Sequence, residues 1–372
     1  MQRALDWIRR RMLVLLLGAY VLGALAPSIG EALREVQIAR VPALGASGFS
    51  VPMAMLGLLL FIAGLGARRN EIVETFRRPK VLLLGLLANA TYPTLFVAAS
   101  SALLPLLGSH SIDEDSQNVL VGLAIVGAMP IAGASVAWSH NTEGNVALSL
   151  GLVWGSTFLS PILSPIVLDV MSTFVRGEYA EDLQEIARQR SAPFFALVVV
   201  VPTVLGIAVQ AVFGRARIAH LLPGLQLLNL VDLLGLNYVN ASISLPDVIA
   251  RPEPDFIVLV AVLTTVMCIC AFAIGWWIPR RFHARREDQT AMMFGLGMSN
   301  NGSGLVLAQA TLVDRPRVLV AIIVYNVIQQ IGAGIVDAHR RRAPSARPSL
   351  APSAEPVRAR PPPAEPERRP AG

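Results

Sequence analysis

The stretch Gly295-Leu296-Gly297-Met298-Ser299-Asn300-Asn301-Gly302-Ser303-Gly304 decides the fold of this chain. Its four glycines and two adjacent asparagines lie inside a longer apolar run, Ala291–Leu312, that is long enough to cross a bilayer. Such a composition is poor for a straight, lipid-facing helix, because non-helical backbone at membrane depth is tolerated only beside protein or a water-filled cavity. The stretch therefore predicts a membrane helix that is broken near its centre.

A second apolar run, Val119–Trp138, contains a similar interruption, Gly127-Ala128-Met129-Pro130-Ile131-Ala132-Gly133-Ala134-Ser135. Pro130 removes a main-chain donor, and its ring clashes with the carbonyl four residues back. Gly133 has no side chain that would resist opening of the helix. Glycines alone are also typical of close helix packing in membranes, but two interruptions of this kind favour two broken helices.

Ten apolar runs are candidates to cross a membrane. They are Met12–Ile29, Phe49–Leu65, Val81–Leu104, Val119–Trp138, Val146–Phe174, Pro193–Phe213, Leu225–Leu245, Phe256–Ile278, Ala291–Leu312 and Val318–Val336. Lipid offers no hydrogen-bond partners to the backbone, and the alternating pattern of barrel strands does not occur in the sequence, so these runs should be helices. We expect an all-α polytopic membrane protein with ten transmembrane helices.

The two interrupted runs are the fourth of the first five and the fourth of the last five. Paired interruptions at matching positions are typical of transporters built from two inverted repeats, which bind their solutes near the bilayer midplane. We predict a first five-helix repeat over residues 1–175 and a second over 192–336. Residues 176–191 are expected to form an interfacial connecting helix, and residues 337–372 a disordered, basic, proline-rich cytoplasmic tail.

The composition excludes several classes of protein. Of the 372 residues, 54% are hydrophobic and only 15% are charged, whereas soluble domains carry about 25% charged residues. A soluble enzyme, a disulfide-stapled secreted domain and a nucleic-acid reader are therefore excluded. The sequence shows no nucleophile–base pair or metal constellation in a credible context, so we expect no enzymatic activity and no cofactor. The expected partners are the lipid bilayer and a small solute.

Basic residues flank alternate ends of the apolar runs, which predicts the orientation in the membrane. They are Arg3, Arg9, Arg10, Arg11, Arg68, Arg69, Arg77, Arg78, Lys80, Arg280, Arg281, Arg285, Arg286, Arg340, Arg341 and Arg342. The connection between the third and fourth runs instead carries acids, Asp113, Glu114 and Asp115. We expect an integral protein of the plasma (inner) membrane with both termini cytoplasmic.

The chain resembles the bile acid:sodium symporter family over nearly all of residues 10–336. The resemblance is carried by Gly144-Asn145-Val146-Ala147-Leu148-Ser149 and Ser156-Thr157-Phe158-Leu159-Ser160-Pro161, with shorter matches at Gly297–Asn300 and Arg78–Val81. It implies ten helices in two inverted repeats, divided into a panel domain and a core domain. It also implies that the fourth and ninth helices cross at their broken centres, and that amphipathic organic anions are transported with sodium.

The resemblance implies ion-binding residues, with departures from the family pattern. Ser135 and Ser149 match serines of one sodium site, but Val136, Val153 and Gly295 stand where the family has an asparagine, a threonine and an acid. A hard cation prefers several oxygen ligands, so losing the charged one predicts that this first site is lost. A second, weaker site is expected from Asn89, Ser299 and the carbonyls of Leu296 and Met298.

Substrate contact is expected where the two broken helices cross, from Pro130, Gly133, Asn300 and Asn301. Exposed amides at helix amino termini favour an anion, whereas freed carbonyls favour a cation. Gln330 in the tenth run is a further candidate for substrate contact. It and the neighbouring Gln329 are first of all expected to hydrogen-bond across helices.

Asp232 lies inside the seventh run, between Asn229 and Asn240. A carboxylate at mid-membrane is costly and marks a solute or proton pathway by default, so Asp232 is a candidate proton-coupling residue. The alternative is that this segment is shallow or lines an aqueous vestibule, where Asp232 is merely hydrated. The amphipathic spacing of the three residues is compatible with both interpretations.

These observations predict a secondary active transporter that moves an organic anion by alternating access. Sodium coupling follows from the resemblance, although the sodium site is depleted. A proton-coupled or uncoupled carrier on the same fold is the alternative, and its uptake would ignore external sodium. A membrane sensor is a weaker alternative, because it would need a folded output module and the tail offers only a Pro/Arg-rich segment.

Overall fold

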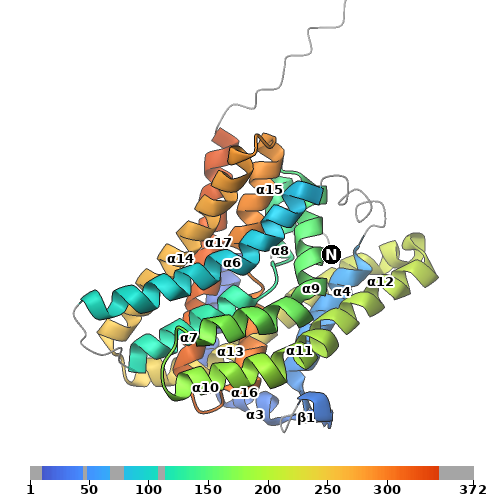
Figure 1. The fold of residues 1–372 in the computed structure, drawn as a ribbon. Helices are drawn as coiled ribbons and strands as arrows, with labels where there is room; N and C mark the ends of the chain where they lie inside the picture. The colour runs from blue at the N-terminus through green and yellow to red at the C-terminus, as the bar shows by residue number, and fades with distance from the viewer. Residues whose placement is uncertain (1–10, 45–47, 68–78, 108–113, 343–372) are drawn as a thin grey trace, which may run out of the picture.

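A computed structural model describes residues 11–44, 48–67, 79–107 and 114–342. The helices of the first half are α2 (Met12–Leu25), α3 (Ser28–Glu35), α4 (Val51–Leu65), α6 (Pro79–Leu103), α7 (Glu114–Ala128), α8 (Ala134–Asn141) and α9 (Val146–Ser172). Those of the second half are α10 (Glu178–Glu185), α11 (Ser191–Phe194), α12 (Val201–Phe213), α13 (Arg215–Ala250), α14 (Pro254–Arg281), α15 (Arg286–Gly297), α16 (Asn301–Thr311) and α17 (Pro316–Arg342). Helix thus occupies part of every one of the ten predicted ranges (Figure 1).

Six helical stretches among the described residues are long and apolar enough to cross a membrane. They are Pro79–Leu106, Val146–Ser172, Glu178–Phe213, Arg217–Ala250, Pro254–Arg281 and Pro316–Arg340. The bent pair α2 and α3 would make a seventh. The prediction of a helical membrane protein is therefore confirmed, while ten crossings and the inverted repeats stay predictions.

The amino-terminal region corrects two expectations. The run Met12–Ile29 is not one helix, since α2 and α3 meet at an angle of 87°. Ala26 lies before Pro27 and leaves the helical region, with φ −135° and ψ 68°, because a following proline disfavours helical backbone in the residue before it. The fold is also not purely helical, because β1 (Gln37–Ala39) pairs antiparallel with β2 (Phe49–Ser50).

Helices extend beyond the bounds of two predicted segments. The predicted connector 176–191 is continuous with the next span, because Glu178–Phe213 forms one helical stretch through two π-helical segments, η3 (Ile186–Arg190) and η4 (Phe195–Val200). Leu183 and Ile186 are buried against α9, since their helical spacing gives this stretch an apolar face. The tail begins later than residue 337, as α17 continues to Arg342; residues 343–372 lie outside the described residues.

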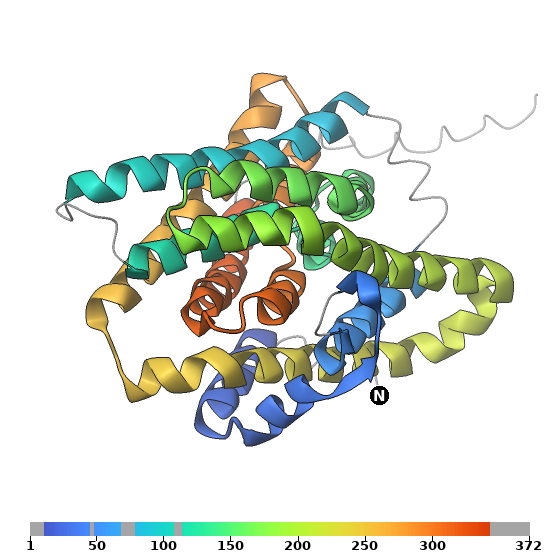
Figure 2. The same ribbon diagram turned by 60° about the horizontal axis from the view of Figure 1, so that its bottom comes forward.

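The helices pack in two groups (Figure 2). In the α13 group, α13 packs along α2 and α4, and α4 packs along α12. In the α17 group, α17 packs on α7 and α14, and α14 on α15, while α6 and α9 pack on each other. The interruptions of the fourth and ninth predicted runs, α7–α8 and α15–α16, belong to the α17 group.

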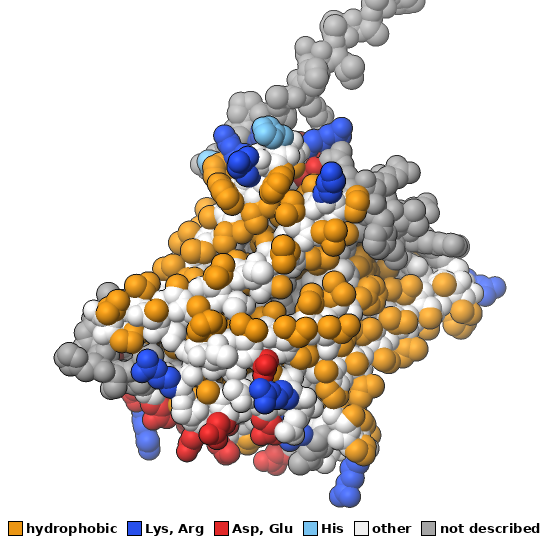
Figure 3. Space-filling model, viewed as in Figure 1, with side chains coloured by type: hydrophobic (Ala, Val, Ile, Leu, Met, Phe, Trp, Pro, Cys, Tyr) orange, Lys and Arg blue, Asp and Glu red, His pale blue; other side chains and the backbone are white. Residues whose placement is uncertain are grey.

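An apolar belt crosses the face of the molecule seen in Figure 3, between two charged ends. Exposed leucine, isoleucine and valine side chains of α6, α9, α12 and α14 contribute to the belt, among them Leu83, Leu95, Ile162, Leu205 and Ile269. Apolar side chains exposed on this scale mark a lipid or protein contact surface. Because the belt coincides with the long apolar helices, it fits the hydrocarbon layer of a bilayer.

One charged end is held together by two arginines at the start of α17. Arg317 bonds Asp115 of α7 at 2.7 Å and Glu253, the residue before α14. Arg315 bonds Glu178 of α10 at 2.9 Å and Asp182 of the same helix at 2.5 Å, which raises the pKa of its guanidinium. Charge pairs of this kind are screened by salt when exposed, but several joined in a network fix the ends of neighbouring helices.

Candidate functional site

The two broken helices meet at their interruptions. Helix α7 ends at Ala128 and α8 begins at Ala134, whereas α15 ends at Gly297 and α16 begins at Asn301. The amide of Asn300 donates to the carbonyl of Pro130 at 2.8 Å, and the amide of Ala132 donates to the carbonyl of Met298 at 2.9 Å. Ile131 and Ser299 thus form an antiparallel bridge. Both predicted interruptions are confirmed, and the chain segments that replace helix at these points contact each other directly.

Serines of α9 satisfy backbone groups that the first interruption leaves free. A helix end leaves carbonyls and amides without partners inside the helix. The Ser164 hydroxyl donates to the carbonyl of Ala128 at 2.6 Å, and the Ser156 hydroxyl accepts from the amide of Ile131 at 3.0 Å. Residues spaced by four lie on one face of a helix, so α9 can present both serines to the two sides of one interruption.

Gln329 of α17 plays the corresponding part at the second interruption. Its Oε1 accepts from the amide of Ser299 at 3.0 Å, and its Nε2 donates to the carbonyl of the same residue at 3.2 Å. Gln329 is 2% exposed, so this two-bond contact is shielded from water. The prediction that Gln329 hydrogen-bonds across helices is confirmed.

The predicted substrate-contact residues do gather at the crossing. Pro130 is buried and bonds Asn300 through its carbonyl, while the Asn300 side chain caps α16 by accepting from the amide of Ser303 at 3.3 Å. Asn301 is 1% exposed, and neither polar atom of its amide has a partner among the described residues. Gly133 is exposed, with open space where a Cβ would lie.

Two helix amino termini give this crossing its electrostatic character. α8 and α16 both begin here, and the first turn of a helix carries about half a positive charge on its free amides. The described part of the crossing holds no charged side chain between residues 129 and 135 or between 297 and 303. The positive ends of two helices and a buried amide without partners are suited to hold an anionic group.

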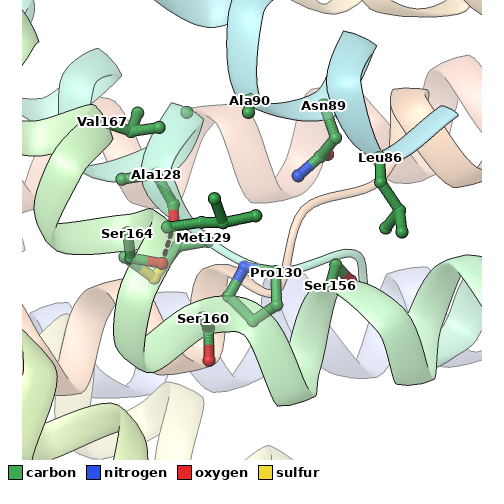
Figure 4. A pocket seen from close by; sticks show the side chains of 12 residues that line it. Leu86, Asn89, Ala90, Ala128, Met129, Pro130, Ser156, Ser160, Ser164 and Val167 are labelled. Atoms are coloured by element: carbon green, nitrogen blue, oxygen red, sulfur yellow. Dashed lines mark hydrogen bonds between the residues drawn. The ribbon is translucent and has the colours of Figure 1, made fainter. Parts of the chain in front are cut away.

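A small cavity of about 20 Å³, lined by both polar and apolar side chains, lies beside the first interruption (Figure 4). Asn89 of α6 lines it together with Ser156 and Ser160 of α9 and with Met129 and Pro130. This volume holds about one water molecule. No residue of the second interruption lines the cavity, so Asn89 is placed at the α7–α8 side of the crossing.

The two carbonyls predicted for the second ion site already accept hydrogen bonds. The carbonyl of Leu296 accepts from the hydroxyl of Tyr92 at 3.4 Å, and that of Met298 accepts from the amide of Ala132. Each carbonyl oxygen has a second lone pair, which is free to coordinate an ion. Ser299 is 4% exposed, and its backbone is held by Gln329. The second ion site stays a prediction.

The first ion site has its two hydroxyls but an apolar neighbour. The hydroxyls of Ser135 and Ser149 are fully buried and have no partner among the described residues. A Cβ built on Gly295 would lie 2.9 Å from Cδ1 of Leu152 and 4.0 Å from Cδ1 of Ile131. Apolar side chains therefore fill the space that an acidic residue at position 295 would need.

Two predicted residues lie on neighbouring helices. Asp232 on α13 is 8% exposed, and its Oδ2 is buried without a partner among the described residues. This burial favours the intramembrane interpretation of Asp232 over a hydrated side chain. Gln330 on α17 is half-buried, next to the residue that holds Ser299. The roles of both residues stay predictions.

Sequence reasoning missed the residues that hold the crossing from outside. Ser156 was noted only for its family-like motif, although the four-residue spacing of Ser156, Ser160 and Ser164 already indicates a polar helix face. Tyr92 carries no sequence signal, because a single tyrosine in an apolar helix is equally typical of packing. Its role depends on a partner more than 200 residues away.

Comparison with known proteins agrees with this geometry. The Sodium Bile acid symporter family matches residues 53–251, more than half of the chain. The chain belongs to the sodium bile acid symporter family. The matched range contains the α7–α8 interruption and the serines of α9, and it ends before α14, so that it does not include the second interruption.

Curated relatives from this comparison cover most of the chain at low identity. A Bacillus subtilis protein named Uncharacterized protein YbaS is 22% identical over 76% of this chain and 85% of its own length. Uncharacterized sodium-dependent transporter YocS of the same organism is 24% identical over 68% of this chain and 72% of its own length. Probable sodium/metabolite cotransporter BASS2, chloroplastic, of rice is 24% identical over 68% of this chain and 55% of its own length. Family membership and these names support a transporter that resides in a membrane and moves a solute.

Proposed function

We propose that this family member carries a small or amphipathic organic anion across the membrane by alternating access, with the anion held where the two interrupted helices cross. The observation that carries the proposal is the bridge between Ile131 and Ser299, which brings the amino termini of α8 and α16 to one place. Amides without helical partners at both termini favour a carboxylate or a similar anion. The amide of Asn301, which has no partner among the described residues, supplies a polar contact, and the open space at Gly133 supplies room.

Sodium is the coupling ion that the family name and the names of two relatives suggest. Ser135 and Ser149 offer two buried hydroxyl oxygens that have no partner in the part of the chain that the structure describes, and Asn89 offers an amide oxygen beside a water-sized cavity. The first site lacks its acid, because glycine stands at position 295 and Leu152 fills the space beside it. Sodium binding would then rest on the second site, built from neutral oxygens, which attract a monovalent cation less strongly than a charged one.

Proton coupling is the second candidate, and Asp232 is the observation that favours it. A buried carboxylate with an oxygen that lacks a partner is costly in an apolar surrounding unless it takes up a proton. Asp232 lies on α13, which contacts α16, one of the two helices that begin at the crossing. A proton taken up and released there during the cycle would supply the driving force that sodium supplies in the first proposal.

The proposed orientation places both termini in the cytoplasm, in a plasma (inner) membrane. Arg280, Arg281, Arg285 and Arg286 lie together at the end of α14 and the start of α15, and basic side chains gather at that charged end in Figure 3. A cluster of this kind on one side favours the cytoplasmic face. The basic residues before residue 11 and those between residues 68 and 78 lie outside the described residues.

Uptake into proteoliposomes tests the proposal. The purified chain is reconstituted and offered radiolabelled organic anions, bile acids and short carboxylates among them, under a sodium gradient, a proton gradient or neither. Accumulation that collapses when choline replaces sodium supports sodium coupling, whereas accumulation that follows the proton gradient supports the second candidate. Uptake of every anion no faster than into empty vesicles would contradict the proposal.

A further inference from the structure

A chain of buried and half-buried hydrogen bonds leads away from the crossing to the other helix group. Gln329, which holds the backbone of Ser299, also donates from Nε2 to Oδ1 of Asn326 at 3.0 Å, one turn earlier on α17. Asn326 in turn donates to the hydroxyl of Tyr20 on α2 at 2.7 Å, with a longer contact of 3.4 Å to Oδ1 of Asn237 on α13. The Tyr20 hydroxyl donates to the same Asn237 oxygen at 2.9 Å.

A second contact joins the two groups one turn further along α13. Gln309 of α16 donates from Nε2 to Oδ1 of Asn240. Asn237 and Asn240 are three residues apart, so they share one face of α13 and reach α17 and α16 side by side. Asn237 is 3% exposed, Asn240 is 0% exposed and Gln309 is 5% exposed, so the contact between Asn240 and Gln309 is shielded from bulk water, whereas Asn326 is half-buried.

We propose that Asn237 and Asn240, with their partners Asn326 and Gln309, form a polar latch that holds the α13 group against the α17 group in this conformation and opens when the transporter changes its conformation. The proposal rests on the proposed function, because alternating access requires one helix group to move against the other. The latch is tied to the site through Gln329, so a solute that displaces the backbone of Ser299 also displaces a partner of Asn326.

The bonding of the latch suits a contact that opens and closes. All four side chains are neutral, and a neutral hydrogen bond contributes a net stabilisation of about 1 kcal/mol, far less than a buried ion pair would cost to break. Nδ2 of Asn240 and Oε1 of Gln309 are buried without partners among the described residues. These spare donors and acceptors can bond new partners after a shift of α13 along α16, so the amides need not lose all their bonds.

Distances between spin labels test the latch. Nitroxide labels are placed by His220→Cys on α13 and His339→Cys on α17, two exposed positions, in full-length protein whose Cys268 and Cys270 are replaced by alanine. We expect Asn326→Leu and Asn240→Leu each to populate a second distance between the labels. The ratio of molecules at the second distance to molecules at the parental distance should rise about fivefold, the effect of one net hydrogen bond. Asn237→Leu combined with Asn326→Leu should be non-additive, since both remove the same contact.

Ser244→Ala is the matched control, because Ser244 is buried on the same helix and its hydroxyl has no partner among the described residues. It should keep the parental distances. Gln309→Ala serves as a milder variant where a leucine variant is not monodisperse. Parental distances in folded latch variants, or the same shift in Ser244→Ala, would overturn the latch. If the latch variants shift the distances while no anion is taken up, the latch stands and the proposed function fails. If anion is taken up while the latch variants keep the parental distances, the proposed function stands and the latch fails.

Discussion

Leu152 occupies the space that a side chain at position 295 would need, since a Cβ on Gly295 would lie 2.9 Å from its Cδ1. Leu152 is 0% exposed and packs with Ile131 and Leu148 in an apolar cluster. A carboxylate there would be both crowded and unpaired. We therefore expect Gly295→Glu to lower the free energy of unfolding by more than about 2 kcal/mol, seen as a lower Tm in detergent.

The double variant Gly295→Glu with Leu152→Ala separates crowding from charge. It makes room for the acid that the family resemblance assigns to the same ion site as Ser135 and Ser149, whose hydroxyls have no partner among the described residues, so we expect sodium chloride to raise its Tm more than choline chloride does. The parent should show a smaller difference between the two salts. A Gly295→Glu variant as stable as the parent in sodium-free buffer would show that Leu152 does not block this position.

Ser164 should stabilise the first interruption through its bond to Ala128. Its hydroxyl donates to the buried carbonyl of Ala128 at the end of α7, and a buried acceptor left without a partner costs about 1–3 kcal/mol. We expect Ser164→Ala to lower Tm and to reduce anion uptake, because the geometry of the crossing depends on that helix end. Ser172→Ala is the control, since Ser172 is equally buried but bonds only the carbonyl of Asp169 within its own helix. Equal losses in both variants would contradict a specific role for Ser164.

The interruptions could be predicted from sequence because their causes are local. Pro130 and the glycines from Gly295 to Gly304 weaken helix wherever they stand. That the two interruptions meet follows from their matching places in the two halves, and the bridge between Ile131 and Ser299 confirms it.

Contacts between distant segments could not be predicted in this way. Whether Ser164, Tyr92 or Asn326 bonds another helix depends on how the helices rotate against each other, which no local pattern determines. The length of the connecting helix was missed for a related reason. Charged residues in 176–191 indicate an interface, yet Leu183 and Ile186 find their apolar partner on α9 and continue the helix into the next span.

Asp232→Asn tests proton coupling. If the carboxylate carries the proton, the amide cannot replace it, and we expect uptake driven by a proton gradient to fall at least tenfold while counterflow exchange of the anion persists. Asp247→Asn is the matched control, because Asp247 is exposed at the far end of the same helix. Unchanged dependence of uptake on pH in Asp232→Asn would remove Asp232 from the coupling mechanism.

The ion pair between Glu253 and Arg317 makes the stability of this charged end depend on pH. Its hydrogen bonds with Arg317 hold the pKa of the Glu253 carboxyl below the usual value of 4.5. A carboxyl whose pKa is lower in the folded chain than in the unfolded one stabilises the fold above its unfolded pKa, and this contribution is lost as the pH falls through the lowered value. We therefore expect the parent to have a higher Tm than Glu253→Gln at pH 7, and the difference to shrink steadily between pH 5 and pH 3.

High salt should reduce the difference at pH 7, because Glu253 is exposed and its charge is screened. Glu35→Gln, at the exposed end of α3, is the control and should leave the profile of Tm against pH unchanged. A difference that grows on acidification would have the wrong sign for an ion pair between Glu253 and Arg317.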